Sequence, residues 1–226
     1  MEYKMLSHSP SIVTSGLVLY LDAANRRSYP GSGTSWFDLS GNGNNGTLTN
    51  GPTFNSGNGG SIVFDGVNDY ILLPNGLLSG TGNFTVNQFI SNASGDGGTI
   101  FGNYSAGNLQ MFFGTRFIGM WLNNSTTYLG VDPWNVTLPE YTTAPVMITA
   151  LRSGTVTRFY INGILKKTGA SSDTIGSASA QFRIGTNTVN TEQYTGRIHI
   201  TQVYNRTLSD VEIQQNFNAT RGRFGI

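Results

Sequence analysis

Two aspartates four positions apart, Asp65 and Asp69, are the acidic side chains best placed to bind a metal ion. They lie in a short polar turn with Gly66, and an apolar, strand-like run stands on each side of it. Calcium takes about six to eight oxygen ligands in a flexible geometry, so these carboxylates and nearby backbone carbonyls could hold one ion. In the alternative interpretation, Asp65 accepts backbone N–H bonds within the turn and Asp69 begins the next strand.

Aromatic side chains form a second group that could do chemistry, because aromatic rings stack on the apolar faces of sugars. Four of them are candidates for glycan contact: Trp121, Tyr128, Trp134 and Tyr141. Trp134 is predicted at the tip of a loop. In the alternative interpretation, Trp121 belongs to the core, since Met120 and Leu122 beside it are typical of a strand. Trp134 would then pack on the rim of the domain or at a subunit contact.

Residues for catalysis are scarce. There is no cysteine, which excludes a disulfide framework and a metal site with cysteine ligands. A histidine-dependent site would have to use His8 or His199, and His199 is predicted in the middle of a strand as a hydrogen-bonded surface or interface residue. We therefore expect no enzymatic activity and no cofactor, apart from a weakly bound structural calcium ion.

The composition limits the kinds of molecule that the protein is expected to bind. Charged residues make up 11% of the 226 residues, against about a quarter in average proteins. The formal net charge of +1 gives no electrostatic basis for binding nucleic acid. No apolar run approaches the length of a transmembrane helix, and the first residues lack the apolar core of a signal peptide. We expect neither nucleic acid nor a membrane as a partner, and synthesis without a signal peptide.

The candidate residues would be positioned by an all-β fold. From residue 61 onward, short apolar runs alternate with turn residues, which is typical of a two-sheet antiparallel sandwich. Strands are predicted at residues 17–21, 61–65, 69–74, 84–91, 98–104, 108–114, 117–122, 127–131, 146–152, 155–161, 164–168, 180–185 and 195–204. Asn162 and Gly163 stand between two apolar runs and predict a hairpin with a type I′ turn.

One short helix is predicted near residues 209–219, after the last strand. Ser209 and Glu212 have the spacing of a capping box, in which each side chain bonds the backbone N–H of the other residue. Leu208, Val211 and Phe217 are expected to face the sheet.

The chain is predicted to form a single domain over residues 16–226, preceded by an N-terminal arm at residues 1–15. Residues 22–60 are rich in Gly, Asn, Ser and Pro and are predicted as one long ordered loop of the domain. Apolar residues within that loop, such as Trp36 and Phe54, are expected to hold it against the sandwich.

Several short motifs occur in a fixed order between residues 61 and 217. They are Phe64-Asp65-Gly66 with Asp69-Tyr70, Asn83-Phe84-Thr85-Val86, Gly98-Thr99-Ile100-Phe101-Gly102, Arg158-Phe159-Tyr160-Ile161-Asn162-Gly163, Phe182-Arg183-Ile184-Gly185 and Tyr204-Asn205-Arg206-Thr207-Leu208-Ser209. In this order they resemble the concanavalin A-like lectin/glucanase superfamily, in its laminin-G-like branch. The resemblance implies a two-sheet antiparallel jelly-roll sandwich, to which the sequence adds one short C-terminal helix.

The resemblance also bears on catalysis and on calcium. Enzymes of the superfamily carry a Glu-x-Asp-x-(x)-Glu pattern on one strand, and this sequence has no such pattern. Relatives usually place an Asp-Glu pair where His199 and its neighbour stand, near the calcium site of the family. The loss of that acidic pair favours the turn interpretation of Asp65 and Asp69 over calcium binding.

Both ends of the chain, residues 16–48 and 214–226, are similar to domains of tailed-phage virion proteins. The resemblance implies a virion structural protein, of the head decoration or fibre type, on the exterior of a particle made in the host cytoplasm. Its expected partners are other virion proteins and further copies of itself, with a trimer as the guess. Apolar residues of the arm and the tail are the expected assembly contacts: Tyr3, Met5, Leu6, Ile12, Val13, Phe224 and Ile226.

The alternative is a carbohydrate-binding module that attaches the particle to glycans on the host surface. The superfamily is rich in lectins, but a fold does not fix a function.

Overall fold

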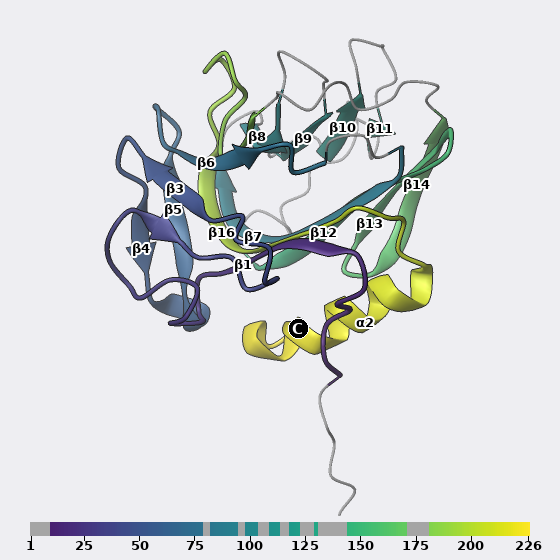
Figure 1. The fold of residues 1–226 in the computed structure, drawn as a ribbon, viewed down its shortest axis with the longest axis horizontal. Helices are drawn as coiled ribbons and strands as arrows, with labels where there is room; N and C mark the ends of the chain where they lie inside the picture. Colours follow the sequence, from purple (N-terminus) through teal and green to yellow (C-terminus); the bar gives the residue numbers. More distant parts are fainter. Residues whose placement is uncertain are drawn as a thin grey trace, which may run out of the picture.

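The computed structural model describes residues 10–78, 82–94, 98–103, 109–113, 118–122, 129–130, 144–170 and 181–226. Two antiparallel sheets lie face to face, and a helix near the C-terminus covers the outside of one of them (Figure 1). The predicted all-β sandwich with one C-terminal helix is confirmed. No helix in these ranges is long and apolar enough to cross a membrane.

The first sheet has eight strands within the described residues. Its order is β14 (Ile164–Ala170), β13 (Val156–Ile161), β12 (Val146–Ser153), β7 (Phe84–Ser94), β16 (Thr195–Tyr204), β5 (Ser61–Asp65) and β4 (Thr53–Asn55), while β1 (Leu17–Asp22) also pairs with β16. The predicted type I′ hairpin joins β13 to β14, since Asn162 and Gly163 have φ angles of 51° and 78°.

The second sheet also has eight strands within the same ranges. Its order is β11 (Leu129–Gly130), β10 (Ile118–Leu122), β9 (Leu109–Phe113), β8 (Gly98–Gly102), β15 (Gln181–Ile184), β6 (Tyr70–Asn75), β3 (Gly46–Thr49) and β2 (Ser35–Trp36). Each strand predicted from residue 61 onward is present, with ends shifted by at most three residues.

The main core lies between the two sheets and follows from the alternation of side chains along each strand. In β9, Leu109, Met111 and Phe113 are buried in this core, so the residues between them must face the other way. In β10, Met120 and Leu122 are buried in the same core on either side of Trp121. The alternation therefore assigns Gln110, Phe112 and Trp121 to the outer face of the second sheet.

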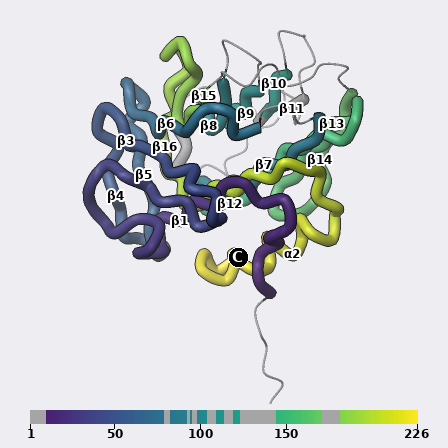
Figure 2. Tube along the Cα trace, viewed as in Figure 1, coloured from purple at the N-terminus to yellow at the C-terminus, as the bar shows by residue number. Residues whose placement is uncertain are grey.

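A second core lies between the outer face of the first sheet and the helix α2 (Asp210–Thr220). Phe89, Met147, Tyr160 and Tyr204 come from the sheet, and Ile213 and Phe217 come from α2. Residues 10–16 run beside α2, as Figure 2 shows, and Val13 joins the same cluster. The backbone N–H of Val13 donates to Asn216 Oδ1 over 2.8 Å, which fixes this segment on the helix.

The helix differs from the prediction in the face that it buries. Ser209 and Glu212 form the predicted capping box, and Leu208 and Phe217 are buried as expected. Val211, however, is 77% exposed, so its predicted contact with the sheet is wrong. Residues four apart share a helix face, so Ile213 packs with Phe217, and Val211, two residues before Ile213, points away.

The predicted long loop at residues 22–60 is also corrected in part. It is ordered, and it contains the short strands β2, β3 and β4, which extend both sheets. Trp36 is buried in the main core and Phe54 packs against it as expected, whereas Phe37 is 43% exposed. Strands of two to four residues in a Gly- and Asn-rich segment are too short to show a periodic pattern.

Asp38 organises the turn between β2 and β3. Its Oδ1 accepts hydrogen bonds from the backbone N–H groups of Tyr20 (2.9 Å) and Ser40 (2.8 Å). Its Oδ2 accepts from the Ser40 hydroxyl (2.7 Å) and from the backbone N–H of Asn44 (3.0 Å). One carboxylate thus ties the turn to β1, and all four bonds depend on it.

Candidate functional site

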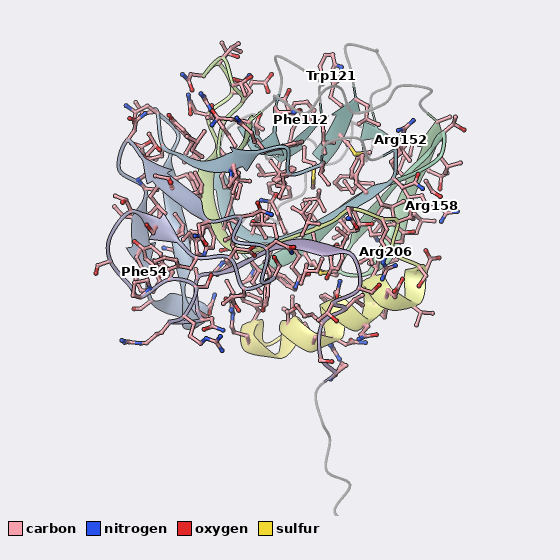
Figure 3. All side chains as sticks on the ribbon, viewed as in Figure 1. Phe54, Phe112, Trp121, Arg152, Arg158 and Arg206 are labelled. Carbon is pink, nitrogen blue, oxygen red and sulfur yellow. The ribbon has the colours of Figure 1, made fainter. Side chains whose placement is uncertain are left out.

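The outer face of the second sheet carries a set of polar and aromatic side chains that we call the polar–aromatic face. Its members from the strands are Tyr70, Thr99, Gln110, Phe112, Trp121 and Arg183, and Glu192 joins them from the loop between β15 and β16. Figure 3 shows Phe112 and Trp121 on the side of the second sheet that faces away from the first. Such a face is unusual in this molecule, because the outer face of the first sheet is covered by α2.

The aromatic part of the face is a pair of rings on neighbouring strands. Phe112 and Trp121 have their ring centroids 6.1 Å apart at an angle of 68°, an edge-to-face arrangement. Phe112 is buried and Trp121 is partly exposed. Met120 and Leu122, the neighbours of Trp121, lie in the main core, but Trp121 does not. The alternative that Trp121 belongs to the core is therefore wrong, and contact between Trp121 and a ligand stays a prediction.

The polar part of the face is a buried hydrogen-bonded group. Gln110 Nε2 donates to Thr99 Oγ1 over 2.5 Å and also to the carboxylate of Glu192. The Thr99 hydroxyl donates to Glu192 Oε2 over 3.1 Å. A backbone bond from Thr99 N–H to the Glu192 carbonyl, also 3.1 Å, holds the loop on the sheet. The carboxylate is therefore fixed in place on the face by two strands.

On β9 and β10, two polar atoms of this face are buried without any hydrogen-bond partner, Gln110 Oε1 and Trp121 Nε1. Gln110 is only 1% exposed, so neither water nor a ligand reaches its Oε1 unless the groups that cover it move. The two residues stand directly opposite each other in the register of β9 and β10. Cross-strand neighbours have Cβ atoms about 5 Å apart, so one group that both donates and accepts could bond to both side chains. A hydroxyl is such a group.

Arg183 lies on the same face, nearer to β6. Its Nη1 donates to the Asn187 carbonyl (3.2 Å) and to Asn190 Oδ1 (2.7 Å). The guanidinium carbon lies over the Tyr70 ring, 4.5 Å from its centre, in a cation–π contact. Arg183 Nε is buried and has no hydrogen-bond partner.

Asp65 and Asp69 form a turn in the way that the second interpretation describes. The Asp65 N–H donates to Asp69 Oδ2 (3.1 Å), and Asp65 Oδ1 accepts from the Val67 N–H (2.8 Å). Asp69 is 4% exposed, and this burial raises the pKa of its carboxyl, which disfavours the charged form that a cation needs. Among the described residues, no group of three or more His, Asp or Glu side chains is placed to hold a metal ion. Calcium binding stays a prediction.

His199 is a buried, fully bonded residue of β16. Its Nδ1 lies 2.9 Å from the Gly60 carbonyl, which can only accept, so this nitrogen carries the proton. Nε2 therefore accepts from the Ser91 hydroxyl over 2.8 Å. Burial lowers the pKa of His199 to about 4. A serine that donates to a histidine has the geometry of an activated nucleophile, but His199 is 1% exposed and Ser91 is 2% exposed, so a substrate has no access.

The remaining predicted site residues fall into two groups. Tyr128, Trp134 and Tyr141, predicted to contact glycans, and Tyr3, Met5 and Leu6, predicted to contact other subunits, lie outside the described residues. Ile12, Val13, Phe224 and Ile226 all pack against the second core of their own domain. Phe224, for example, stacks on Phe89 with the ring centroids 4.7 Å apart. A role for these residues in assembly stays a prediction.

Sequence reasoning missed most members of the polar–aromatic face. Gln110 stands alone as a polar residue in a strand whose other four residues are apolar, and this signal could have marked it. Thr99, Arg183 and Glu192 carry no comparable signal, because only the pairing of β8, β9 and β15 brings them together.

Comparison with known proteins identifies the family and the fold. The model of the concanavalin A-like lectin/glucanases superfamily matches residues 65–214. Domain 4 of AbnA, a GH43 extracellular arabinanase from Geobacillus stearothermophilus solved in complex with arabinotriose, is 19% identical with a TM-score of 0.70, and the match covers 89% of this chain and 98% of that domain. A search of curated proteins found no significant match.

Binding domains of clostridial toxins are similar to the same extent. The binding domain of Paraclostridial Mosquitocidal Protein 1 is 17% identical with a TM-score of 0.69, over 90% of this chain and 52% of that one. The binding domain of botulinum neurotoxin DC in complex with SialylT is 13% identical with a TM-score of 0.69, over 92% and 52%. The present chain therefore spans about half the length of these toxin domains, and at such identities the likeness shows the fold alone.

Proposed function

Since the chain belongs to the concanavalin A-like lectin/glucanase superfamily, we propose that it is a non-enzymatic carbohydrate-binding domain that holds a glycan on its polar–aromatic face. The observation that carries the proposal is the cross-strand pair of Gln110 and Trp121, with one acceptor and one donor left unbonded. Once the groups that cover these two atoms move aside, a sugar hydroxyl can accept from Trp121 Nε1 and donate to Gln110 Oε1 at the same time.

The energetics favour a hydroxyl-rich ligand at this place. A buried donor or acceptor without a partner costs about 1–3 kcal/mol, so a ligand that satisfies both atoms recovers part of that cost. The exposed part of the Trp121 ring offers an apolar surface beside them, and the Glu192 carboxylate offers further acceptor oxygens. An apolar surface with a few fixed polar groups is the usual composition of a small-ligand site.

One of the similar structures supports this proposal. Domain 4 of AbnA, of which 98% is matched, was solved with arabinotriose. Sugar binding is therefore found on this fold.

We further propose that the domain does not hydrolyse its ligand. Glycoside hydrolysis uses two carboxyl groups about 5–10 Å apart on one cleft. Within the described residues, Glu192 is the one carboxylate on the polar–aromatic face, and it is bonded to Thr99 and Gln110. Glycosidase assays on β-glucans and arabinans, with release of reducing ends as the readout, test this part of the proposal.

A glycan array followed by calorimetric titration of the best ligand tests the binding proposal. We expect Trp121→Ala and Gln110→Leu each to weaken binding by tenfold or more, because each removes one of the two unbonded atoms. Phe37→Ala is the matched control, since Phe37 is an exposed aromatic outside the face, and it should bind as the wild type does. If no array glycan binds, or if Trp121→Ala binds normally, the proposal is wrong.

The virion role expected from the two ends of the chain remains a second proposal, and its support is the sequence resemblance of residues 16–48 and 214–226. In that case the domain lies on the outside of a particle, as a homo-oligomer in contact with other virion proteins, and its glycan site serves attachment to the host surface. Particles assembled with a variant that lacks residues 2–9 test the arm as an anchor. This variant keeps residues 10–15, which are bonded to α2. Full occupancy of the sites by the shortened protein would contradict an anchoring role.

A further inference from the structure

Arg183 is an arginine with unused hydrogen-bonding capacity on the polar–aromatic face. Only its Nη1 donates to protein groups, the Asn187 carbonyl and Asn190 Oδ1. Nε is buried without a partner, and no carboxylate of the described residues lies within ion-pair distance of the guanidinium. Because Nε is buried, Nη2 is the guanidinium nitrogen left to donate to a ligand, and a carboxylate oxygen would accept from it in a charge-assisted bond.

The Arg183 side chain is pre-organised by its contacts with the protein. Its two bonds to the loop fix Nη1, and the guanidinium carbon contacts the Tyr70 ring, 4.5 Å from its centre. The loop is itself closed at its base by a bond from the Tyr194 N–H to the Gly185 carbonyl (2.9 Å). A pre-organised arginine loses little side-chain entropy when it binds an anion, which raises the affinity of such a contact.

Arg183 also lies in one row with the proposed sugar-binding pair. Reading across the sheet, Arg183 is opposite Gly102, Gly102 is opposite Gln110, and Gln110 is opposite Trp121. Strands are about 5 Å apart, so the backbones at Arg183 and Gln110 are separated by about 10 Å and those at Arg183 and Trp121 by about 14 Å. Gly102 has no side chain to stand between the two ends of the row. The row has the length of two to three linked sugars.

The negative charge of Glu192 and the positive charge of Arg183 lie at different places along the row, so an acidic glycan can bind in only one orientation. Glu192 is bonded to Gln110 and Thr99, so an anionic group placed there would be repelled. The Arg183 end carries the opposite charge. A glycan with one acidic unit would therefore place that unit at Arg183 and a neutral unit at Gln110 and Trp121.

We infer that Nη2 of Arg183 is a subsite for the carboxylate of an acidic sugar, within a glycan whose neutral part lies on Gln110 and Trp121. This inference rests on the proposed glycan-binding function and adds the chemical class of the ligand. The shared chemistry is a sugar carboxylate, which occurs in uronic acids inside a chain and in sialic acids at its end.

Pairs of ligands that differ only in the acidic group test the inference. Trigalacturonic acid is compared with its methyl ester, and sialyllactose is compared with lactose, by calorimetric titration of the full chain at low salt. We expect the wild type to bind the acidic member of one pair at least tenfold more tightly than the neutral member. The pair that shows the preference identifies the source of the carboxylate.

Variants of Arg183 then locate the effect. Arg183→Gln should reduce the preference to less than twofold, and a urea unfolding curve like that of the wild type shows that the variant is folded. Arg183→Lys keeps the charge, but one ammonium group cannot both hold the loop as Nη1 does and bind the ligand as Nη2 does, so it should bind the acidic ligand at least threefold more weakly than the wild type. Arg158→Gln removes the same charge from β13 of the other sheet and should change nothing (Figure 3).

The outcomes separate the two proposals. If the neutral and acidic members of both pairs bind equally, or if the preference survives in Arg183→Gln, the carboxylate subsite is wrong and the glycan-binding function stands. A preference for a sulfated carrageenan oligosaccharide over both carboxylates, lost in Arg183→Gln, would also overturn the assignment to a carboxylate. If no ligand of any kind binds, both proposals fall together.

Discussion

Protonation of His199 should make the folded protein less stable as the pH falls below 7. In the folded state His199 is neutral, because its Nδ1 proton is used by the Gly60 carbonyl and Nε2 accepts from Ser91. Burial lowers its pKa from 6.5 to about 4. The unfolded chain takes up the proton near pH 6.5 and the folded chain does not, so acid favours unfolding across this window.

The size of the effect follows from the two pKa values. A pKa difference of one unit corresponds to about 1.4 kcal/mol, so the full shift is worth about 3 kcal/mol once the pH falls to 4. Between pH 7 and pH 5, the free energy of unfolding should fall by about 2 kcal/mol. Glu212 contributes little there, because Arg206 lowers its pKa to about 2 and it stays charged down to much lower pH. Burial raises the pKa of Asp69, so this carboxyl acts in the opposite direction to His199 as the pH falls.

Urea unfolding at intervals of half a pH unit between 7 and 5, followed by tryptophan fluorescence, measures this slope. His199→Gln removes the titrating group and can still donate to the Gly60 carbonyl, so it should be less stable at pH 7 but should lose most of the slope. The reasoning is refuted if the free energy of unfolding of the wild type is flat between pH 7 and 5, or if the slope is the same in His199→Gln.

Three further substitutions test other parts of the fold. Asp38→Ala leaves three backbone N–H groups without their acceptor and should lower the free energy of unfolding by about 3 kcal/mol in urea titrations, whereas Asp38→Asn, which keeps one oxygen, should cost less. Phe224→Ala removes the ring stacked on Phe89 and should cost about 2 kcal/mol by the same measurement, with Val211→Ala, an exposed apolar control, near zero. Chelation with EDTA should leave the melting temperature nearly unchanged, and a large drop that calcium restores and Asp65→Ala abolishes would contradict the turn interpretation.

The sequence was sufficient for most of the fold because most strands are long enough to show their pattern. Runs such as β12 and β16 are almost wholly buried and bounded by turn residues, and each was placed within a residue of its observed ends. The strands β2, β3 and β4 were not predicted, because two to four residues cannot display alternation and their pairing partners lie in distant strands. Their place in the sheets is decided by tertiary contacts such as the burial of Trp36.

The candidate site was less predictable for a related reason. Trp121 could be named from its residue type, but its importance depends on facing Gln110, and this register is fixed by the pairing of β9 with β10. Glu192 reaches the face only because a loop folds back over β8. A single sequence shows which residues alternate along one strand, and it does not show which strands are neighbours.

The two outer faces of the sandwich explain why one of them is the better candidate for binding. On the first sheet, α2, residues 10–16 and the C-terminal segment supply apolar side chains that close the face into a second core, and His199 within it has both ring nitrogens bonded. On the second sheet, the described residues place amide, indole, guanidinium and carboxylate groups among the aromatic rings, and three of these groups keep unbonded buried atoms. Buried polar atoms are normally paired, and leaving them unpaired lowers stability. Unbonded buried atoms also occur on the outer side of the first sheet, at Arg223 Nε and Nη2, so they do not by themselves single out one face. Within the described residues, the second sheet differs in that Trp121 and Arg183 are partly exposed on its outer face, whereas the rings on the outer face of the first sheet are covered by α2 and the C-terminal segment. This exposure makes the second sheet the better candidate for a ligand.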